Sequence, residues 1–294
     1  MSRFQDARAP EPEEGLPQLV DVDFEDGNGH ATSQLRVASL AEPAPKEVKF
    51  TKPRTAETAP LTLETIMETC PMCNWVPDAS ILVSFRSDAS VKGAEEFRAL
   101  RSRLYQLREK LPLKSLLVSS ALPGEGRSFV AANLARVLAL QPGCQVLLID
   151  GDLRASKLHS TFGTSAIPGL TEYLSNEVGE LEIIQRGSAD NLFLIPGGRP
   201  TSGQTELIAN ARFKLLLGRV SLAFDWIVID SSAAIPVSDA SLIATWCDAV
   251  LMVVRSNATP FDIVRKACRR FREESLVGVL LNGISNQDTN HTKY

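Results

Sequence analysis

The chain has 294 residues, of which 44% are hydrophobic and 22% charged, and its formal net charge is -4. These values are typical of a globular protein that can bury a core, and the charge gives no electrostatic reason to expect a nucleic acid partner. No run of about 18 apolar residues occurs, so we expect no transmembrane helix. The N-terminus lacks the apolar core of a signal peptide and the five cysteines are an odd number. We therefore expect a cytoplasmic protein without a disulfide framework.

The first part of the chain is polar and rich in proline. Nine of the 17 prolines precede Ala79. Such a composition buries too little apolar surface to offset the chain entropy lost on folding. We therefore predict a largely disordered extension at 1–80, a folded domain at 81–284 and a flexible tail at 285–294.

A single Cys-x-x-Cys pair, Cys70 and Cys73, lies within this first part. One pair supplies half of a tetrahedral zinc site, and no second pair follows. We favour ordinary free thiols, with an intersubunit zinc site or a redox pair as alternatives.

The segment 94–110 has the periodicity of an amphipathic helix. At about 100° per residue, its apolar stripe consists of Phe97, Leu100, Leu104, Leu107 and Leu111. Glu95, Arg98 and Arg101 lie on the adjoining face, where we expect all three to be free to contact another subunit. A solvated helix face is the alternative.

Six short apolar runs alternate with helix-length segments in the rest of the chain. The runs are 116–120, 146–149, 192–195, 226–229, 249–254 and 277–281. They lack period-two alternation, which favours parallel strands covered on both faces. The further helix-length segments are 128–140, 205–222 and 260–274. This alternation predicts an α/β fold with a doubly wound, mostly parallel sheet.

A glycine-rich loop, Ala121-Leu-Pro-Gly-Glu-Gly-Arg-Ser128, joins the first run to the next helix. Loops of this kind bind phosphate through backbone N–H groups and the helix dipole. We expect ATP or ADP to contact Pro123, Gly124, Glu125, Gly126, Arg127, Ser128 and Phe129. Ser128 is predicted to bind Mg²⁺, and Arg127, where lysine is usual, to hold the β- and γ-phosphates.

Two later runs end in carboxylates. Asp150 and Asp152 follow one run, with Arg154 two residues further on, and Asp230 ends another. In an open α/β sheet, the carboxyl ends of the strands line the ligand crevice beside the phosphate loop. Carboxylates that face a triphosphate favour a divalent metal between them, whereas a helix N-cap is the alternative for each aspartate alone.

Together these motifs resemble the bacterial tyrosine kinases of the capsular and exopolysaccharide type, which are related to the MinD/ParA-like P-loop ATPases. The resemblance runs from about residue 81 to 282. It rests on the phosphate loop, the Asp150-x-Asp152-x-Arg154 element and the Walker B strand that ends at Asp230. It implies an ATP-dependent tyrosine autokinase that regulates the biosynthesis and export of exopolysaccharide or capsular polysaccharide.

The resemblance also implies roles for individual residues. Asp150 and Asp230 would hold Mg²⁺, and Asp152 would accept the proton of the attacking tyrosine hydroxyl. Arg127 would act in catalysis, and Arg154 would contact the nucleotide.

Assembly and partners follow from the same resemblance. Glu95-x-x-Arg98-x-x-Arg101 matches the motif through which these kinases form ring-like homo-oligomers. Tyr294 in the tail would accept phosphate in a neighbouring subunit. A membrane-embedded polysaccharide chain-length protein would activate the kinase and recruit it to the inner face of the plasma membrane.

The chain departs from the family pattern at three places. Arg127 replaces lysine, Ser231-Ser232-Ala233 replaces Thr-Pro-Pro, and the tail has one tyrosine in place of a cluster. Two alternatives stay open: a catalytically impaired nucleotide-binding scaffold and a MinD/ParA-like ATPase switch. Leu122 stands where the switch proteins carry a characteristic lysine, which counts against the switch.

Overall fold

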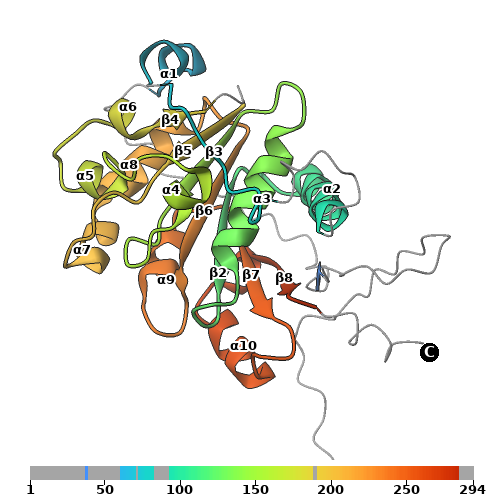
Figure 1. Ribbon diagram of the computed structural model, residues 1–294. Coiled ribbons are helices and arrows are strands. Elements are labelled where there is room, and N and C mark those ends of the chain that lie inside the picture. The colour runs from blue at the N-terminus through green and yellow to red at the C-terminus, as the bar shows by residue number, and fades with distance from the viewer. Residues whose placement is uncertain (1–36, 39–59, 71, 83–92, 188–190, 285–294) are drawn as a thin grey trace, which may run out of the picture.

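The computed structural model describes residues 37–38, 60–70, 72–82, 93–187 and 191–284. A twisted central sheet lies between helices, with the strand order β1-β8-β7-β2-β6-β3-β5-β4 (Figure 1). The strands are β1 (Val37–Ala38), β2 (Ser115–Ser120), β3 (Val146–Asp150), β4 (Gln185–Arg186), β5 (Leu192–Ile195), β6 (Trp226–Ala233), β7 (Ala249–Arg255) and β8 (Leu276–Asn282). The neighbours from β8 to β5 are parallel, and β1 and β4 add antiparallel edges.

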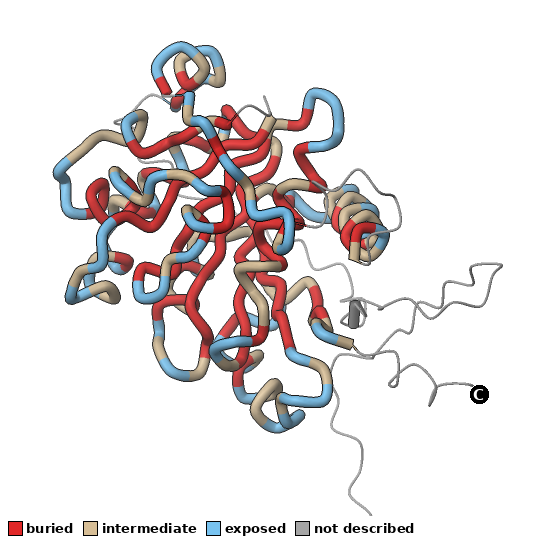
Figure 2. Tube along the Cα trace, in the orientation of Figure 1, coloured by how far each residue is buried: buried red, intermediate tan, exposed pale blue. Residues whose placement is uncertain are grey.

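Each of the six predicted apolar runs is a strand of this sheet, which confirms the predicted fold class. Side chains along each central strand alternate between two cores: on β2, Leu117 enters one core, and Leu116 and Val118 enter the other. Figure 2 shows the central strands buried along their length. Burial on both faces explains why the runs lack period-two alternation.

The helices cover both faces of the sheet. They are α1 (Leu63–Thr69), α2 (Ala94–Lys110), α3 (Arg127–Ala139), α4 (Leu158–Phe162), α5 (Leu170–Leu174), α6 (Glu180–Ile183), α7 (Gln204–Ala209), α8 (Ala211–Val220), α9 (Asp239–Ala244) and α10 (Phe261–Cys268). Helices α2 and α3 pack on one face, and α8 and α9 on the other.

Two predicted helices differ from the structure in their bounds. The segment 205–222 forms α7 and α8, because Asn210 has an extended backbone and accepts the Arg212 N–H at 3.0 Å, which caps α8. The segment 260–274 is helical only to Cys268, with a short 3₁₀ turn at Glu273–Ser275.

Residues 60–70 and 72–82 belong to the folded domain, which corrects the predicted boundary at residue 80. Ile66 on α1 is fully buried, and the Trp75 ring packs on Phe162 with 5.1 Å between ring centroids. Leu82 lies in the same core cluster as the buried side chains of α2. These apolar residues are few and irregularly spaced, so the composition of the segment concealed them. Apart from 37–38, the rest of the predicted extension lies outside the described residues, as does the tail 285–294.

The Cys-x-x-Cys pair lies in this corrected segment. None of the five cysteines, all of which lie in the described ranges, forms a disulfide. The Cys70 thiol is buried and donates to the Leu181 carbonyl at 3.5 Å, and burial raises its pKa to about 11. Cys70 is therefore a packed core residue.

Within the described ranges, no helix has both the length and the apolar composition that crossing a bilayer requires.

Candidate active site

The glycine-rich loop connects β2 to α3. Because β2 ends at Ser120 and α3 begins at Arg127, the first N–H groups of α3 face the loop. Gly124 and Gly126 have φ angles of 85° and 90°, in the left-handed region that favours glycine. A Cβ at Gly126 would also collide with the side-chain amide of Asn282. This geometry is that of a phosphate-binding P-loop.

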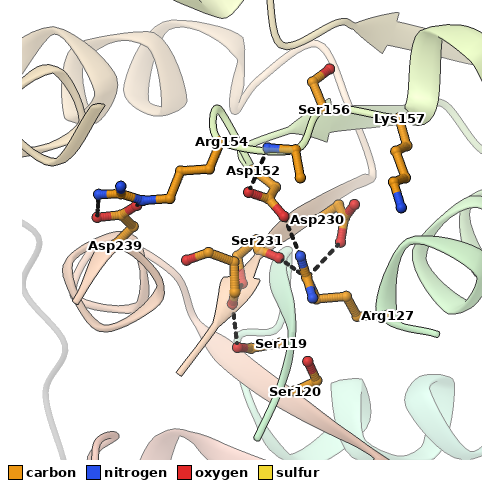
Figure 3. Close-up of polar contacts among 12 residues, drawn as sticks. Ser119, Ser120, Arg127, Asp152, Arg154, Ser156, Lys157, Asp230, Ser231 and Asp239 are labelled. Atoms are coloured by element: carbon orange, nitrogen blue, oxygen red, sulfur yellow. Dashed lines mark hydrogen bonds and ion pairs between the residues drawn. The ribbon is translucent and has the colours of Figure 1, made fainter. Parts of the chain in front are cut away.

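Three carboxylates lie at the same edge of the sheet. Asp150 on β3 and Asp230 on β6 are paired in register, and Asp152 follows β3 by two residues. All three side chains are buried. Figure 3 shows Asp152 and Asp230 on either side of the Arg127 guanidinium. The structure thus gathers acids from two neighbouring strands around the first residue of α3.

The two carboxylate oxygens of Asp150 have different surroundings. Oδ2 accepts hydrogen bonds from the Ser156 hydroxyl at 2.8 Å and from the N–H groups of Lys157 and Leu158 at 3.0 Å each. Oδ1 has no hydrogen-bond partner among the described residues. Burial raises the pKa of this carboxyl, against the effect of the three hydrogen bonds. Oδ2 is therefore satisfied by groups at the start of α4, although Asp150 itself ends β3 and is not the N-cap of that helix, and Oδ1 is buried without a donor among the described residues.

Asp230 has the least compensated side chain of the group. In the part of the chain that the structure describes, neither of its oxygens has a hydrogen-bond partner of ordinary geometry. Burial, followed by the charge of Asp150, raises its pKa to about 8, and Arg127 and the Ser128 hydroxyl oppose this rise. A buried carboxylate of this kind is unfavourable unless a cation compensates it.

The donor set fits Mg²⁺ held jointly with phosphate. Carboxylate oxygens of Asp150 and Asp230 and the hydroxyl of Ser128 are the hard oxygen donors that Mg²⁺ prefers. The described residues contain no cluster of three or more His, Cys, Asp or Glu that would hold a metal without other ligands. Mg²⁺ usually binds proteins through one or two carboxylates, together with waters and substrate phosphates.

Arg127 contacts two of the aspartates, and its expected contact with the β- and γ-phosphates stays a prediction. Its guanidinium donates to the Asp152 carboxylate and to the Ser231 carbonyl, and Nε lies 4.0 Å from Asp230 Oδ1. The planar fork of arginine can bond to several acceptors at once, and buried carboxylates lie within its reach. In this conformation the Arg127 guanidinium is bonded to Asp152, the proposed proton acceptor.

The departure from Thr-Pro-Pro has a structural consequence. Serine retains the backbone N–H that proline lacks, and β6 continues three residues past Asp230, where Ala233 pairs with Ser120. The Ser231 hydroxyl donates to the Val118 carbonyl and the Ser119 hydroxyl to the Ser232 carbonyl, both at 3.0 Å. The two strands are therefore fastened together beside the P-loop.

Arg154 binds a residue that the sequence did not indicate. Its Nε donates to Asp239 Oδ2 at 2.7 Å, and the Thr205 hydroxyl bonds to both Arg154 and Asp239 at 2.7 and 2.6 Å. Figure 3 shows Arg154 directed away from Arg127. Arg154 thus forms an ion pair that joins the Asp152 loop to α9, and its predicted contact with the nucleotide stays a prediction. Asp239 stands at a helix start, where acidic residues are common, so sequence offered no signal for this role.

The remaining predicted P-loop residues have ordinary surroundings. Pro123 and Gly124 are exposed at the tip of the loop, and Ser128 is half-buried on the first turn of α3. Phe129 packs its ring on Phe97 of α2, at 5.8 Å between centroids, so its side chain serves the core.

The charged face of α2 is less free than predicted. Glu95 and Arg98 form an ion pair one turn apart on the outside of the helix. Arg101 donates to the Val137 carbonyl at the end of α3, at 2.9 Å, because its long side chain reaches the neighbouring helix. Tyr294 lies outside the described residues.

Known proteins resemble this chain in sequence and in structure. No protein-family model matches it. Tyrosine-protein kinase CpsD of Streptococcus agalactiae is 33% identical over 198 residues, which are 66% of this chain and 84% of that protein. Tyrosine-protein kinase YwqD of Bacillus subtilis is 30% identical over 203 residues, 68% of this chain and 84% of that protein. The kinase domain of Escherichia coli tyrosine kinase ETK matches with a TM-score of 0.66 at 25% identity, covering 77% of this chain and 88% of that domain.

Proposed function

The chain belongs to the bacterial tyrosine-protein kinases, and we propose that its P-loop binds ATP with Mg²⁺ and that it phosphorylates tyrosine in a second copy of itself. We further propose that this activity regulates exopolysaccharide or capsular polysaccharide biosynthesis and export. One observation carries the proposal: Asp150 and Asp230 have buried oxygens without hydrogen-bond partners of ordinary geometry among the described residues, and these oxygens lie at the P-loop, where Mg²⁺ and a triphosphate would compensate them.

Each residue of the site would have a distinct task in phosphoryl transfer. Ser128, Asp150 and Asp230 would hold Mg²⁺, which would neutralise charge on the phosphate oxygens. The tyrosine oxygen bonds to the γ-phosphorus as the bond between that phosphorus and the β,γ-bridging oxygen breaks, and ADP leaves. Asp152 would take the phenolic proton. Arg127 must first release Asp152, after which its guanidinium would be free to bind phosphate oxygens.

We propose Tyr294 as the acceptor, because the other two tyrosines are packed. Tyr173 is buried, and the Tyr105 hydroxyl lies 3.4 Å from the Trp226 indole nitrogen on the inner side of α2. Residues 285–294, if extended at about 3.3 Å each, would span up to ~33 Å. That reach suits entry into the site of a neighbouring subunit.

The proposed partners of this chain are inferred from its membership of the family. We propose that Glu95 and Arg98 contact the next subunit of a ring-like homo-oligomer. A membrane-embedded polysaccharide chain-length protein would bind the cytoplasmic kinase, activate it and recruit it to the inner face of the plasma membrane.

The test is tyrosine phosphorylation of the purified full chain. We expect mass spectrometry after incubation with ATP, Mg²⁺ and the cytoplasmic segment of a chain-length protein to find phosphate on Tyr294. The Tyr294→Phe variant should lose that signal and keep ATP binding. Absence of phosphotyrosine from both the natural chain and the Arg127→Lys variant would contradict the kinase and favour the nucleotide-binding scaffold.

A further inference from the structure

Glu125 places a carboxylate inside a loop that is built to bind anions. The residue is only 2% exposed. Oε2 accepts the N–H of Leu122 at 2.6 Å, within the loop itself. Oε1 accepts the Thr259 hydroxyl at 2.5 Å and the Arg255 N–H at 3.2 Å. All three partners donate; Arg255 is the last residue of β7, and Thr259 lies in the connection between β7 and α10.

The same side of the loop is held at two further points. The Arg255 guanidinium donates to the Gly124 carbonyl at 3.4 Å. Asn282, the last residue of β8, donates its side-chain amide to the Glu125 carbonyl at 2.9 Å and closes the space beside Gly126. The P-loop is therefore attached to the ends of β7 and β8, in addition to its covalent links to β2 and α3.

We propose that Glu125 is a positioning residue that fixes the P-loop for nucleotide and couples nucleotide binding to the start of α10. This inference rests on the proposed function. A negative charge close to bound phosphate is repulsive, so a carboxylate in this loop is unfavourable for binding unless it supports the loop's shape. Glu125 supports that shape because its two oxygens connect Leu122 with Thr259 and Arg255. A shift of the loop around a ligand must then move the β7–α10 connection.

Glu125→Gln tests the hydrogen bonds with little change of size. A glutamine has one acceptor oxygen and one donor nitrogen. In either orientation its NH₂ group faces a backbone N–H, from Leu122 or from Arg255, so one side of the connection is lost. Thr259→Val removes a single donor and serves as a milder second variant. Thr245→Val is the matched control, because that hydroxyl bonds only locally, to the Leu242 carbonyl at 2.7 Å, near the opposite edge of the sheet.

Hydrogen–deuterium exchange of the full chain, with and without saturating ATP and Mg²⁺, measures the coupling. In the natural chain and in Thr245→Val, we expect nucleotide to slow exchange in both 121–128 and 255–264. In Glu125→Gln, protection should persist in 121–128 and disappear from 255–264, with the dissociation constant for ATP raised about tenfold. Thr259→Val should reduce protection of 255–264 and weaken ATP binding about threefold.

Three results would overturn the inference. The first is a natural chain that shows protection in 121–128 and none in 255–264. The second is a folded Glu125→Gln variant that keeps both regions protected at unchanged affinity. The third result applies if Glu125→Gln does not fold: a Thr259→Val variant whose protection of 255–264 and ATP affinity equal those of the natural chain. A natural chain without nucleotide protection in 121–128 contradicts the proposed function itself, which separates the two failures.

Discussion

Two aspartates lie at opposite ends of the parallel strands, Asp248 at the amino ends and Asp230 at the carboxyl ends, and they differ in their hydrogen-bond donors. Asp248, just before β7, accepts the N–H groups of Lys114 and Ser115 at 3.1 and 2.7 Å and the Ser115 hydroxyl at 2.8 Å. Asp230 accepts no backbone N–H within the described part of the chain, and Arg127 Nε lies 4.0 Å from its Oδ1. Strands begin with free N–H groups at the amino edge, which donate to an acid, but end in carbonyl oxygens at the carboxyl edge, which cannot. Asp248 therefore receives backbone donors from a neighbouring strand, whereas the charge beside Asp230 is that of Arg127, which the proposed Mg²⁺ would supplement.

The groove and the proposed active site lie at different ends of the strands. A groove of about 700 Å³ opens at the amino edge, lined by Trp246, Phe271 and Leu217 among others. Its polar groups include Lys114, whose ammonium donates to the Ser221 carbonyl at 2.6 Å, and the satisfied Asp248. The buried carboxylate oxygens without hydrogen-bond partners among the described residues lie at the other end of the strands, at the P-loop. We therefore assign the active site by these oxygens and not by the volume of the groove.

The largest expected effect is at Asp230. Asp230→Asn removes a proposed metal-binding charge, and we expect the affinity for ATP with Mg²⁺ to fall about 100-fold or more by calorimetry. Unchanged affinity would mean that Asp230 is as structural as Asp248.

The same variant should stabilise the ligand-free protein at alkaline pH. The folded-state pKa of Asp230, about 8, lies above the usual value near 4 for an aspartate. Protonation of Asp230 therefore favours folding at low pH, and this contribution is lost as the pH rises toward 8. At pH 8 we expect Asp230→Asn to melt about 2–4 °C higher than the natural chain, with a smaller difference at pH 5. A lower melting temperature at pH 8 would contradict the assigned pKa.

Asp248→Ala should show the opposite pattern. Loss of the carboxylate leaves the N–H groups of Lys114 and Ser115 without this acceptor, and we expect a loss of about 2–3 kcal/mol in the free energy of unfolding, measured with urea. ATP affinity, measured where the variant is folded, should be unchanged. A selective loss of ATP binding would place the functional site at the wrong edge.

The sequence was sufficient for the sheet and the P-loop because both depend on local pattern. Apolar runs that end in Asp150 and Asp230 determine where the acids lie once parallel strands are assumed. The partners of charged side chains are set by tertiary packing. No local pattern shows that Arg127 bonds to Asp152, that Arg154 pairs with Asp239, or that Arg101 reaches Val137.

Arg127→Lys tests whether the guanidinium of Arg127 slows the reaction by holding Asp152. Lysine lacks the fork that binds Asp152 and the Ser231 carbonyl together, so Asp152 should be released more readily. We expect the autophosphorylation rate to rise about three- to tenfold, with little change in ATP affinity. A slower variant, measured by initial rates of phosphotyrosine formation, would indicate that the guanidinium itself stabilises the transferred phosphate.

The smallest expected effect is on the outer face of α2. Exposed ion pairs contribute about 0–1 kcal/mol, so Arg98→Ala should weaken self-association up to about fivefold in light scattering across a concentration series. Arg103→Ala, an exposed arginine elsewhere on the same helix, is the control. Identical masses for the natural chain and Arg98→Ala at every concentration would leave Glu95 and Arg98 as a solvated surface pair.

The most direct test of the account compares the natural chain with Asp152→Asn, in both ATP binding and tyrosine phosphorylation. Asparagine keeps the size of the side chain but cannot accept the phenolic proton as a base. We predict a fall of about 100-fold or more in the rate of phosphotyrosine formation, with ATP affinity within a few fold of that of the natural chain. Phosphotyrosine formed at an unchanged rate by Asp152→Asn would contradict the role of this edge in catalysis.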